Sequence, residues 1–239
     1  MAEPQKTKIK AVFFDAADTL FRVRGSVGEV YSRVARKYGA EATAEELNRE
    51  FHKAFSSSPR MAFPGANYTE IKRLEKKWWY NLVYNVFKDI EIFSRFDEFF
   101  DELFEVFGGK KAWELFPETR DVLRFLKSRD LLLGIVSNFD SRLYDLLVEL
   151  EVLNYFDLVV ISSQVGFAKP SPEIFQIALE RGKLFPEEAI HVGDSLEEDV
   201  QGASAAGINP VLLDRKAEYC NLTDVRRISK LSELKNLVF

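Results

Sequence analysis

Polar side chains that can do chemistry lie in four segments that each follow a short apolar run. The residues are Asp15, Ser137, Lys169 and Asp194. A carboxylate can act as a nucleophile or bind a hard metal ion, whereas a hydroxyl and an ammonium group can bind phosphate oxygens. Because open parallel sheets bind ligands at the carboxyl ends of their strands, these side chains are expected to converge. The pattern predicts a hydrolase that acts on a phosphate ester.

The charge of such a substrate assigns a role to each group. A phosphate monoester is dianionic and repels a carboxylate nucleophile, and Mg²⁺ between the two removes this repulsion. Asp15 and Asp194 are the predicted magnesium ligands, together with a backbone carbonyl and water. Asp15 is also the predicted nucleophile, and Lys169 and Ser137 are expected to stabilise the charge on the transferred group. The predicted cofactor is Mg²⁺, and the predicted intermediate is an aspartyl-phosphate.

Four further residues are candidates for substrate binding because they flank Asp15 or Ser137. They are Ala16, Ala17, Thr19 and Asn138. Backbone N–H groups after the nucleophile can bind the equatorial oxygens of the phosphoryl group. Thr19 is expected to support the turn that holds the nucleophile. The predicted partner is a small phosphorylated molecule.

The elements that must position these residues follow from hydrophobic patterning. Helical patterns separate most of the apolar runs; one example is a set of leucines spaced i, i+3, i+4 and i+7 that begins at Leu143. Alternating strands and helices predict an α/β fold with a Rossmann-like, doubly wound parallel sheet and helices on both faces. Five apolar runs read as strands buried on both faces: 9–14, 131–136, 158–161, 189–192 and 211–213.

A long helical segment interrupts this alternation. Aromatic residues recur in it at helical spacing, and such residues are expected to fill the core of a small bundle. The charged run Glu75-Lys76-Lys77 is expected to face solvent. The predicted organisation is a Rossmann-like hydrolase core at 1–22 and 113–239 with an inserted all-helical cap at 23–112.

The composition limits the partners and the cellular location that can be expected for this chain. The chain has 239 residues and a net charge of −5, which argues against a general nucleic-acid binder because such proteins present a basic face. Its single cysteine, Cys220, is expected to be a structural thiol, and no apolar stretch approaches the ~20 residues of a membrane helix. The first residues lack an apolar signal segment. A cytoplasmic protein with no nucleic-acid or membrane partner is expected. His52 and His191 are expected to be structural, and nothing in the sequence indicates an oligomeric state.

The four segments resemble, in order, the four motifs of the haloacid dehalogenase-like hydrolase superfamily. The helical insert lies where that superfamily places its first type of cap, between the first and second motifs. Within the superfamily the motifs look most like the branch called haloacid dehalogenase-like hydrolase domain-containing protein 3, or rhythmically-expressed-gene-2-like. The resemblance implies the following roles: Asp15 as nucleophile, Ser137 as second-motif residue, Lys169 as third-motif lysine, Asp194 as metal ligand and Asp199 as an acidic partner near the metal or the lysine.

The first motif departs from the usual phosphatase form, Asp-x-Asp-x-Thr. The second Asp of that form protonates the leaving alcohol and then activates water, and the position is Ala17 here. The backbone carbonyl of Ala17 can still bind magnesium, but the proton-transfer role is lost. General acid–base catalysis is worth roughly 10²–10⁴ in rate. Asp18 is expected to point away from the site and to stabilise the loop.

This departure leaves four functions open. The first is a phosphatase with slow turnover or an acidic leaving group, such as an acyl or aryl phosphate. The second is a binding or regulatory protein that kept the site without turnover. The third is a 2-haloacid dehalogenase, because a halide leaves without a proton, although that reaction needs no metal. The fourth is a phosphonatase-like enzyme, which would need a Schiff-base lysine in the cap, such as Lys53.

Overall fold

The computed structural model describes residues 8–90 and 92–237. Its main sheet has six parallel strands in the order β5-β4-β1-β6-β7-β8. All five apolar runs expected to be strands lie in this sheet, so the predicted α/β, Rossmann-like fold is confirmed; the short last strand was not expected. The strands are β1 (Ala11–Phe14), β4 (Leu132–Ser137), β5 (Leu158–Ile161), β6 (Ala189–Gly193), β7 (Asn209–Leu213) and β8 (Arg227–Ile228).

Helices cover both faces of the sheet, as the near-continuous apolar strands require. Val12 and Phe14 pack toward the helices α5 and α6, and Phe13 packs toward α8 and α9 on the opposite face. The helical elements of the core are α5 (Thr119–Lys127), α6 (Leu143–Glu149), Leu153–Tyr155, α7 (Ser162–Val165), α8 (Pro172–Gly182), Pro186–Glu188, the π-helical turn Leu196–Gln201, α9 (Gly202–Ala205) and Leu231–Asn236.

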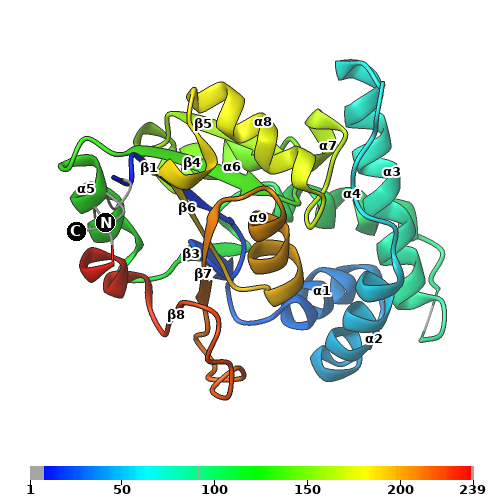
Figure 1. Ribbon diagram of the computed structural model, residues 1–239. Coiled ribbons are helices and arrows are strands. Elements are labelled where there is room, and N and C mark those ends of the chain that lie inside the picture. The colour runs from blue at the N-terminus through cyan, green and yellow to red at the C-terminus, as the bar shows by residue number, and fades with distance from the viewer. Residues whose placement is uncertain (1–7, 91, 238–239) are drawn as a thin grey trace, which may run out of the picture.

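Four helices follow the first strands and lie together on one side of the molecule (Figure 1). Local sequence explains where two of them begin, because Thr43 with Glu46 and Asn67 with Glu70 form reciprocal capping boxes. Their aromatic residues pack on one another as expected; the Phe87 ring, for example, contacts three other phenylalanine rings and the ring of Tyr31. The helices are α1 (Val27–Ala35) with the short turn Arg36–Tyr38, α2 (Ala44–Ser57), α3 (Tyr68–Phe87) and α4 (Phe96–Phe107).

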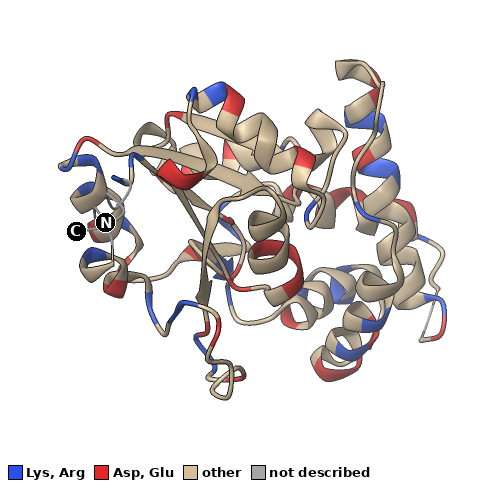
Figure 2. Ribbon diagram, viewed as in Figure 1, with Lys and Arg blue, Asp and Glu red and all other residues tan. Residues whose placement is uncertain are grey.

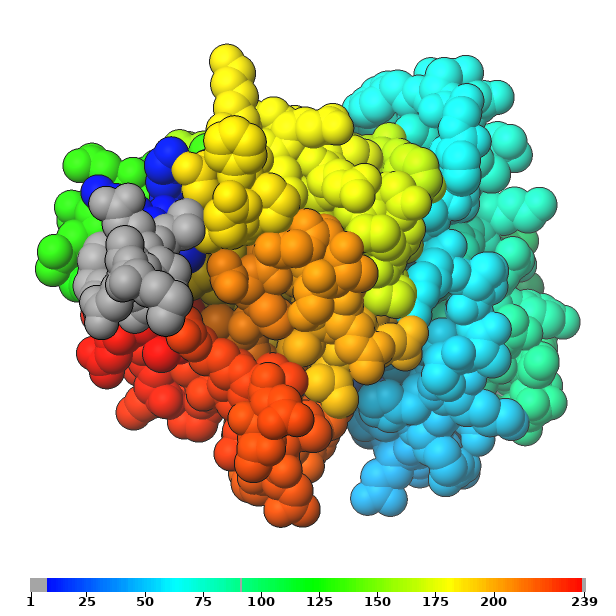
Figure 3. Space-filling model, in the orientation of Figure 1, coloured from blue at the N-terminus to red at the C-terminus, as the bar shows by residue number. Residues whose placement is uncertain are grey.

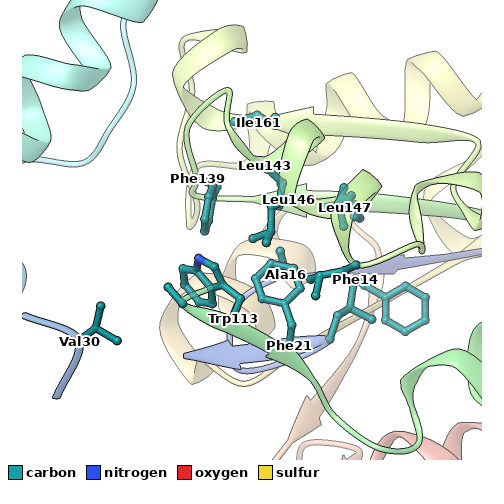
Figure 4. Packing of buried hydrophobic residues seen from close by; sticks show 14 of the residues in the cluster. Phe14, Ala16, Phe21, Val30, Trp113, Phe139, Leu143, Leu146, Leu147 and Ile161 are labelled. Atoms are coloured by element: carbon teal, nitrogen blue, oxygen red, sulfur yellow. The ribbon is translucent and has the colours of Figure 1, made fainter. Parts of the chain in front are cut away.

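An antiparallel pair of strands that the sequence did not reveal joins these helices to the core. β2 (Phe21–Val23) pairs with β3 (Trp113–Leu115), so the chain leaves and returns at one place. The rings of Phe21, Trp113 and Phe139 pack together there, next to the core leucines (Figure 4). The division of the chain at 23 and 112 stays a prediction, and it falls within or beside this ladder.

The charged surface fits the composition. Acidic and basic segments are interspersed over both parts of the molecule (Figure 2). Within the described ranges, no helix is both long and apolar enough to cross a membrane.

One charged residue of the cap is buried against the core, contrary to expectation. Lys76 and Lys77 are exposed as predicted, but Glu75 is only 2% exposed. Its carboxylate accepts hydrogen bonds from Ser141 N at 2.9 Å, Ser141 Oγ at 2.5 Å and Ser163 Oγ at 2.6 Å. The prediction of a solvated face was wrong for Glu75 because the partner serines belong to distant segments of the core, Ser141 to a loop and Ser163 to α7. The surfaces of the cap and the core touch each other in the space-filling view (Figure 3), and α3 and α7 are in contact.

Replacing Glu75 by Ala is expected to lower the free energy of unfolding by about 3 kcal/mol, because it leaves buried donors of two serines without an acceptor. Urea denaturation measures the change. Lys76→Ala is the matched control on the same helix, since its exposed ammonium group makes an ion pair with Asp101 at the surface, and it is expected to change stability by less than about 1 kcal/mol. Equal effects of the two variants would show that the buried hydrogen bonds do not hold the cap.

Candidate active site

The four predicted segments meet at the carboxyl edge of the sheet. Asp15 directly follows β1, Ser137 ends β4, and Asp194 directly follows β6. Since β1 lies between β4 and β6, these residues are neighbours, and the loop after α7 brings Lys169 to them. Ser137 Oγ donates a hydrogen bond to Asp15 Oδ1 at 3.1 Å, and Lys169 Nζ donates to the same oxygen at 2.6 Å. Carboxylate oxygens of Asp15, Asp194 and Asp199 lie within 4.8 Å of one another.

Lys169 is a buried cation held between two carboxylates. Its side chain is 1% exposed, and Nζ lies 2.6 Å from Asp15 Oδ1 and 2.5 Å from Asp199 Oδ1. Burial alone would lower the pKa of Lys169, but the two carboxylates outweigh it and raise that pKa. Lys169 therefore remains positively charged at neutral pH beside Asp15, where a phosphoryl group would be transferred.

The Asp199 carboxylate forms an ion pair with Lys169, and a histidine side chain contacts the same carboxylate. Oδ1 of Asp199 lies 2.9 Å from His191 Nε2, and Oδ2 accepts a hydrogen bond from Ser195 N at 3.0 Å. Burial favours the protonated acid, but Lys169 and His191 together lower the pKa of Asp199. A Cβ atom at position 193 would lie 2.1 Å from the Asp199 side chain, so only Gly193 allows this approach. Sequence reasoning placed His191 in the core but missed this contact.

Asn138 positions the lysine loop with both ends of its amide. Lys169 N donates to Asn138 Oδ1 at 2.8 Å, and Asn138 Nδ2 donates to Lys169 O at 3.0 Å. Nδ2 also lies 2.9 Å from Glu198 Oε2. These contacts explain why an amide follows Ser137, although its role in substrate binding stays a prediction.

Excess negative charge marks the place where a cation would bind. Burial, aided by Asp199, raises the pKa of Asp15 to about 6, even though Lys169 acts against this. Burial and the carboxylates of Asp15, Asp199 and Asp18 raise the pKa of Asp194 to about 8. Because both Asp199 oxygens are engaged by protein groups, the carboxylates that fit a hard divalent cation are those of Asp15 and Asp194. Thr19 Oγ1 donates to Asp194 Oδ1 at 3.4 Å, so Thr19 contacts the predicted metal ligand.

The loop after Asp15 is a tight turn that places Ala17 and Asp18 at the site. Asp18 has a φ of 56°, a conformation that aspartate tolerates, and its N–H donates to Phe21 O at 2.7 Å. Ala17 and Asp18 both line the cavity that contains Asp15. The expectation that Asp18 points away from the site stays a prediction: its side chain is exposed, although its carboxylate helps to raise the pKa of Asp194. Ala17 offers no acid in this turn.

A cavity of about 730 Å³ extends from these residues into the cap. Arg60, in the loop after α2, lines it and forms ion pairs with Glu197 at 2.8 Å and with Glu198 of the core. His52 is exposed on the cap, as expected, and also lines the cavity. Lys53, in contrast, is exposed, pairs with Glu50 and is not among the lining residues. No described cap lysine lines this cavity, so the structure gives no support to a Schiff-base mechanism.

The fold and site geometry define a class that comparison with known proteins confirms. The model of the haloacid dehalogenase-like hydrolase family matches residues 9–207. The chain belongs to this family of hydrolases.

Individual relatives support the assignment to this family. Haloacid dehalogenase-like hydrolase domain-containing protein 3 of Mus musculus is 34% identical over 214 residues, which cover 87% of this chain and 83% of that protein. Rhythmically expressed gene 2 protein of Drosophila melanogaster is 27% identical over 222 residues, which cover 88% and 85%. The crystal structure of a HAD phosphatase from Thermococcus onnurineus superposes with a TM-score of 0.67 at 27% identity, covering 96% of this chain and 98% of that one. The branch that the motifs resembled is thus confirmed.

Proposed function

We propose that the protein is a magnesium-dependent phosphatase that acts on a small phosphorylated molecule through an aspartyl-phosphate on Asp15. The observation that carries the proposal is the environment of Asp15. A positively charged lysine and a serine hydroxyl both bind Oδ1, and the Asp194 carboxyl group, whose pKa burial and neighbouring carboxylates raise, follows the neighbouring strand. The likeness to a HAD phosphatase at 27% identity supports it.

Each residue of the site has its own role in the proposed reaction. Lys169 and Ser137 orient the Asp15 carboxylate through Oδ1 and stabilise charge on the equatorial phosphate oxygens. Asp15 attacks phosphorus, the bond from phosphorus to the leaving oxygen breaks, and that oxygen keeps the electron pair. Water then attacks phosphorus, releasing phosphate and restoring Asp15. Mg²⁺, held by Asp15, Asp194 and the Ala17 carbonyl, would screen the repulsion between carboxylate and phosphate.

Two other functions make different use of the same residues. A dehalogenase would use Asp15 to attack carbon and would gain nothing from Asp194, whose ionised form is costly without a cation. A binding or regulatory protein would need the phosphate site without turnover, and Ala17 is the observation that favours it. The test is a panel of phosphate esters with and without Mg²⁺, with chloropropionate alongside. Phosphate release that requires Mg²⁺ is expected; chloride release without metal would favour the dehalogenase, and no release from any compound would overturn catalysis.

Magnesium binding is expected to depend on pH in a defined direction. Because burial and neighbouring carboxylates raise the pKa of Asp194 to about 8, its carboxyl group is mostly protonated below that pH, and a cation must displace the proton. The affinity for Mg²⁺ should fall by up to about tenfold for each pH unit below 8. Calorimetry in buffers of different ionisation enthalpy measures both the affinity and the proton released. Asp194→Asn should remove the proton release; an affinity independent of pH would rule out Asp194 as a ligand.

A further inference from the structure

The cavity has two ends of different chemistry. One end holds the carboxylates and Lys169, and it needs room only for a phosphoryl group. The other end reaches among all four cap helices and is walled by apolar and aromatic side chains. Those from the helices include Val27, Tyr31, Phe51, Val83, Leu103 and Phe107. The whole cavity, about 730 Å³, is in the range that holds a drug-sized ligand. This apolar end, called the cap chamber below, is suited to the part of the substrate that leaves.

The cap chamber contains a tyrosine hydroxyl that has no hydrogen-bond partner among the described residues. Tyr31 is 2% exposed, and its ring packs against Phe51, Phe87 and Phe107. Tyr31 lines the cavity, and none of the hydrogen bonds among the described residues involves its hydroxyl. Burial raises the pKa of Tyr31, so it remains a donor at any ordinary pH. The hydroxyl is not one of the fully buried polar atoms that lack a partner, so it reaches the open space of the cavity, where a ligand that supplies an acceptor could bind it.

The cavity offers no free positive charge to a second anionic group. The Lys and Arg residues that line it are Arg60, Arg142 and Lys169. Arg60 pairs with two glutamates, and Lys169 pairs with two aspartates. Arg142 pairs with Asp140 at 2.6 Å and lies 3.6 Å from the centre of the Phe104 ring. Among the described residues, every such cation is already neutralised, which disfavours a leaving group with its own phosphate or carboxylate.

The missing acid at position 17 selects the same kind of leaving group. An alcohol must be protonated as its bond to phosphorus breaks, whereas a phenol is acidic enough to leave as phenolate. Ala17 lines the cavity and cannot supply a proton. Aromatic leaving groups therefore suit both the first motif and the cap chamber.

Resting on the proposed phosphatase function, we infer that the substrate is the phosphate monoester of a neutral, largely apolar phenol. Its ring occupies the cap chamber, and an acceptor atom on the ring takes a hydrogen bond from the Tyr31 hydroxyl. Asp15 takes the phosphoryl group, the phenolate leaves with the electron pair of the broken bond, and it gains its proton from water after release.

Turnover of matched substrates tests the charge of the leaving group. Naphthyl phosphate and carboxyphenyl phosphate have phenols of similar acidity, but only the second carries an extra negative charge. With Mg²⁺ present, naphthyl phosphate should have a kcat/KM at least about tenfold higher. Glycerol phosphate and hexose phosphates should be poorer still. A preference for carboxyphenyl, glycerol or hexose phosphates would overturn this inference and leave the phosphatase intact, whereas no turnover of any phosphate would remove the proposed function.

Tyr31→Phe tests the hydroxyl while keeping the ring. It should lower kcat/KM for acetylphenyl phosphate about tenfold and leave phenyl phosphate, which has no acceptor on its ring, within about twofold. Tyr38→Phe is the matched control, because the Tyr38 hydroxyl binds Glu102 and Tyr38 does not line the cavity. Equal losses for both substrates in Tyr31→Phe would overturn the assignment of the hydroxyl.

A binding measurement separates this inference from catalysis. Trp78, Trp79 and Trp113 line the cavity, so a phenol in the chamber should quench tryptophan fluorescence. Hydroxyacetophenone, the neutral product of acetylphenyl phosphate, should quench the metal-free protein, with a dissociation constant about tenfold higher in Tyr31→Phe. Quenching without any phosphatase activity would support the chamber while removing the proposed function. No saturable quenching would show that the chamber does not take a phenol.

Discussion

Replacing Asp15 by Asn is expected to reduce phosphate release from every substrate by roughly 10⁴-fold or more, because the amide cannot form the covalent intermediate. The fold should survive the change. Burial raises the pKa of Asp15 from 3.8 to about 6, so ionisation of its carboxyl group lowers the stability of the fold; the loss develops between these two pH values and is complete above about 6. A neutral Asn of the same shape should leave the protein at least as stable at neutral pH without metal. Steady-state kinetics and thermal denaturation measure the two effects.

The matched control is a conservative change at a supporting residue. Ser137→Ala keeps the nucleophile and removes one donor, whose hydrogen bond to Asp15 is 3.1 Å long. It should lower kcat by roughly 10²–10³-fold, the usual cost of one such donor. Turnover by Asp15→Asn that matches Ser137→Ala would mean that Asp15 is not the nucleophile.

Replacing Ala17 by Asp is expected to raise phosphatase activity, and the size of the gain should depend on the leaving group. For an alkyl phosphate the new acid should raise kcat/KM by roughly 10²–10⁴-fold, because the alkoxide needs a proton. For nitrophenyl phosphate kcat/KM should change little, since nitrophenolate leaves unaided. Its kcat should still rise, because the same carboxylate activates water for the second step.

Ala17→Asn provides the control for size and polarity, since it has no proton to give. Ala17→Asn should raise neither kcat nor kcat/KM. Asp18 also lines the cavity, so Asp18→Asn shows whether that carboxylate already supplies part of the proton transfer. Equal gains from Asp and Asn at position 17 would mean that the missing proton is not what limits turnover.

The strands and the site residues at their ends were predictable because both depend on local sequence. A strand buried on both faces must be a short apolar run, and Ala11–Phe14 is such a run. Polar residues at its carboxyl end can meet only residues at the ends of neighbouring strands, so Asp15, Ser137 and Asp194 converge whatever the details of packing.

Contacts between distant segments were not predictable, because no local pattern encodes them. Glu75 reads as one charge among three on a helix, and only the positions of Ser141 and Ser163 make it an acceptor in the interior. His191 reads as a core residue, and its contact with Asp199 depends on the π-helical turn that follows β6. The strands β2 and β3 are each three residues long, which is too short for an alternating pattern of apolar and polar residues to be recognised.

The most direct test of the central claim is to trap the covalent intermediate. Because Ala17 supplies no base to activate water, hydrolysis of the aspartyl-phosphate should be slower than its formation from an aryl phosphate, and the intermediate should accumulate. Acid quenching during turnover with Mg²⁺ and nitrophenyl phosphate, followed by mass spectrometry, should find one phosphoryl group on the peptide that contains Asp15, and less of it in Ala17→Asp. Turnover with no phosphoryl group on that peptide, or with one on another residue, would contradict the assignment of Asp15 as the nucleophile.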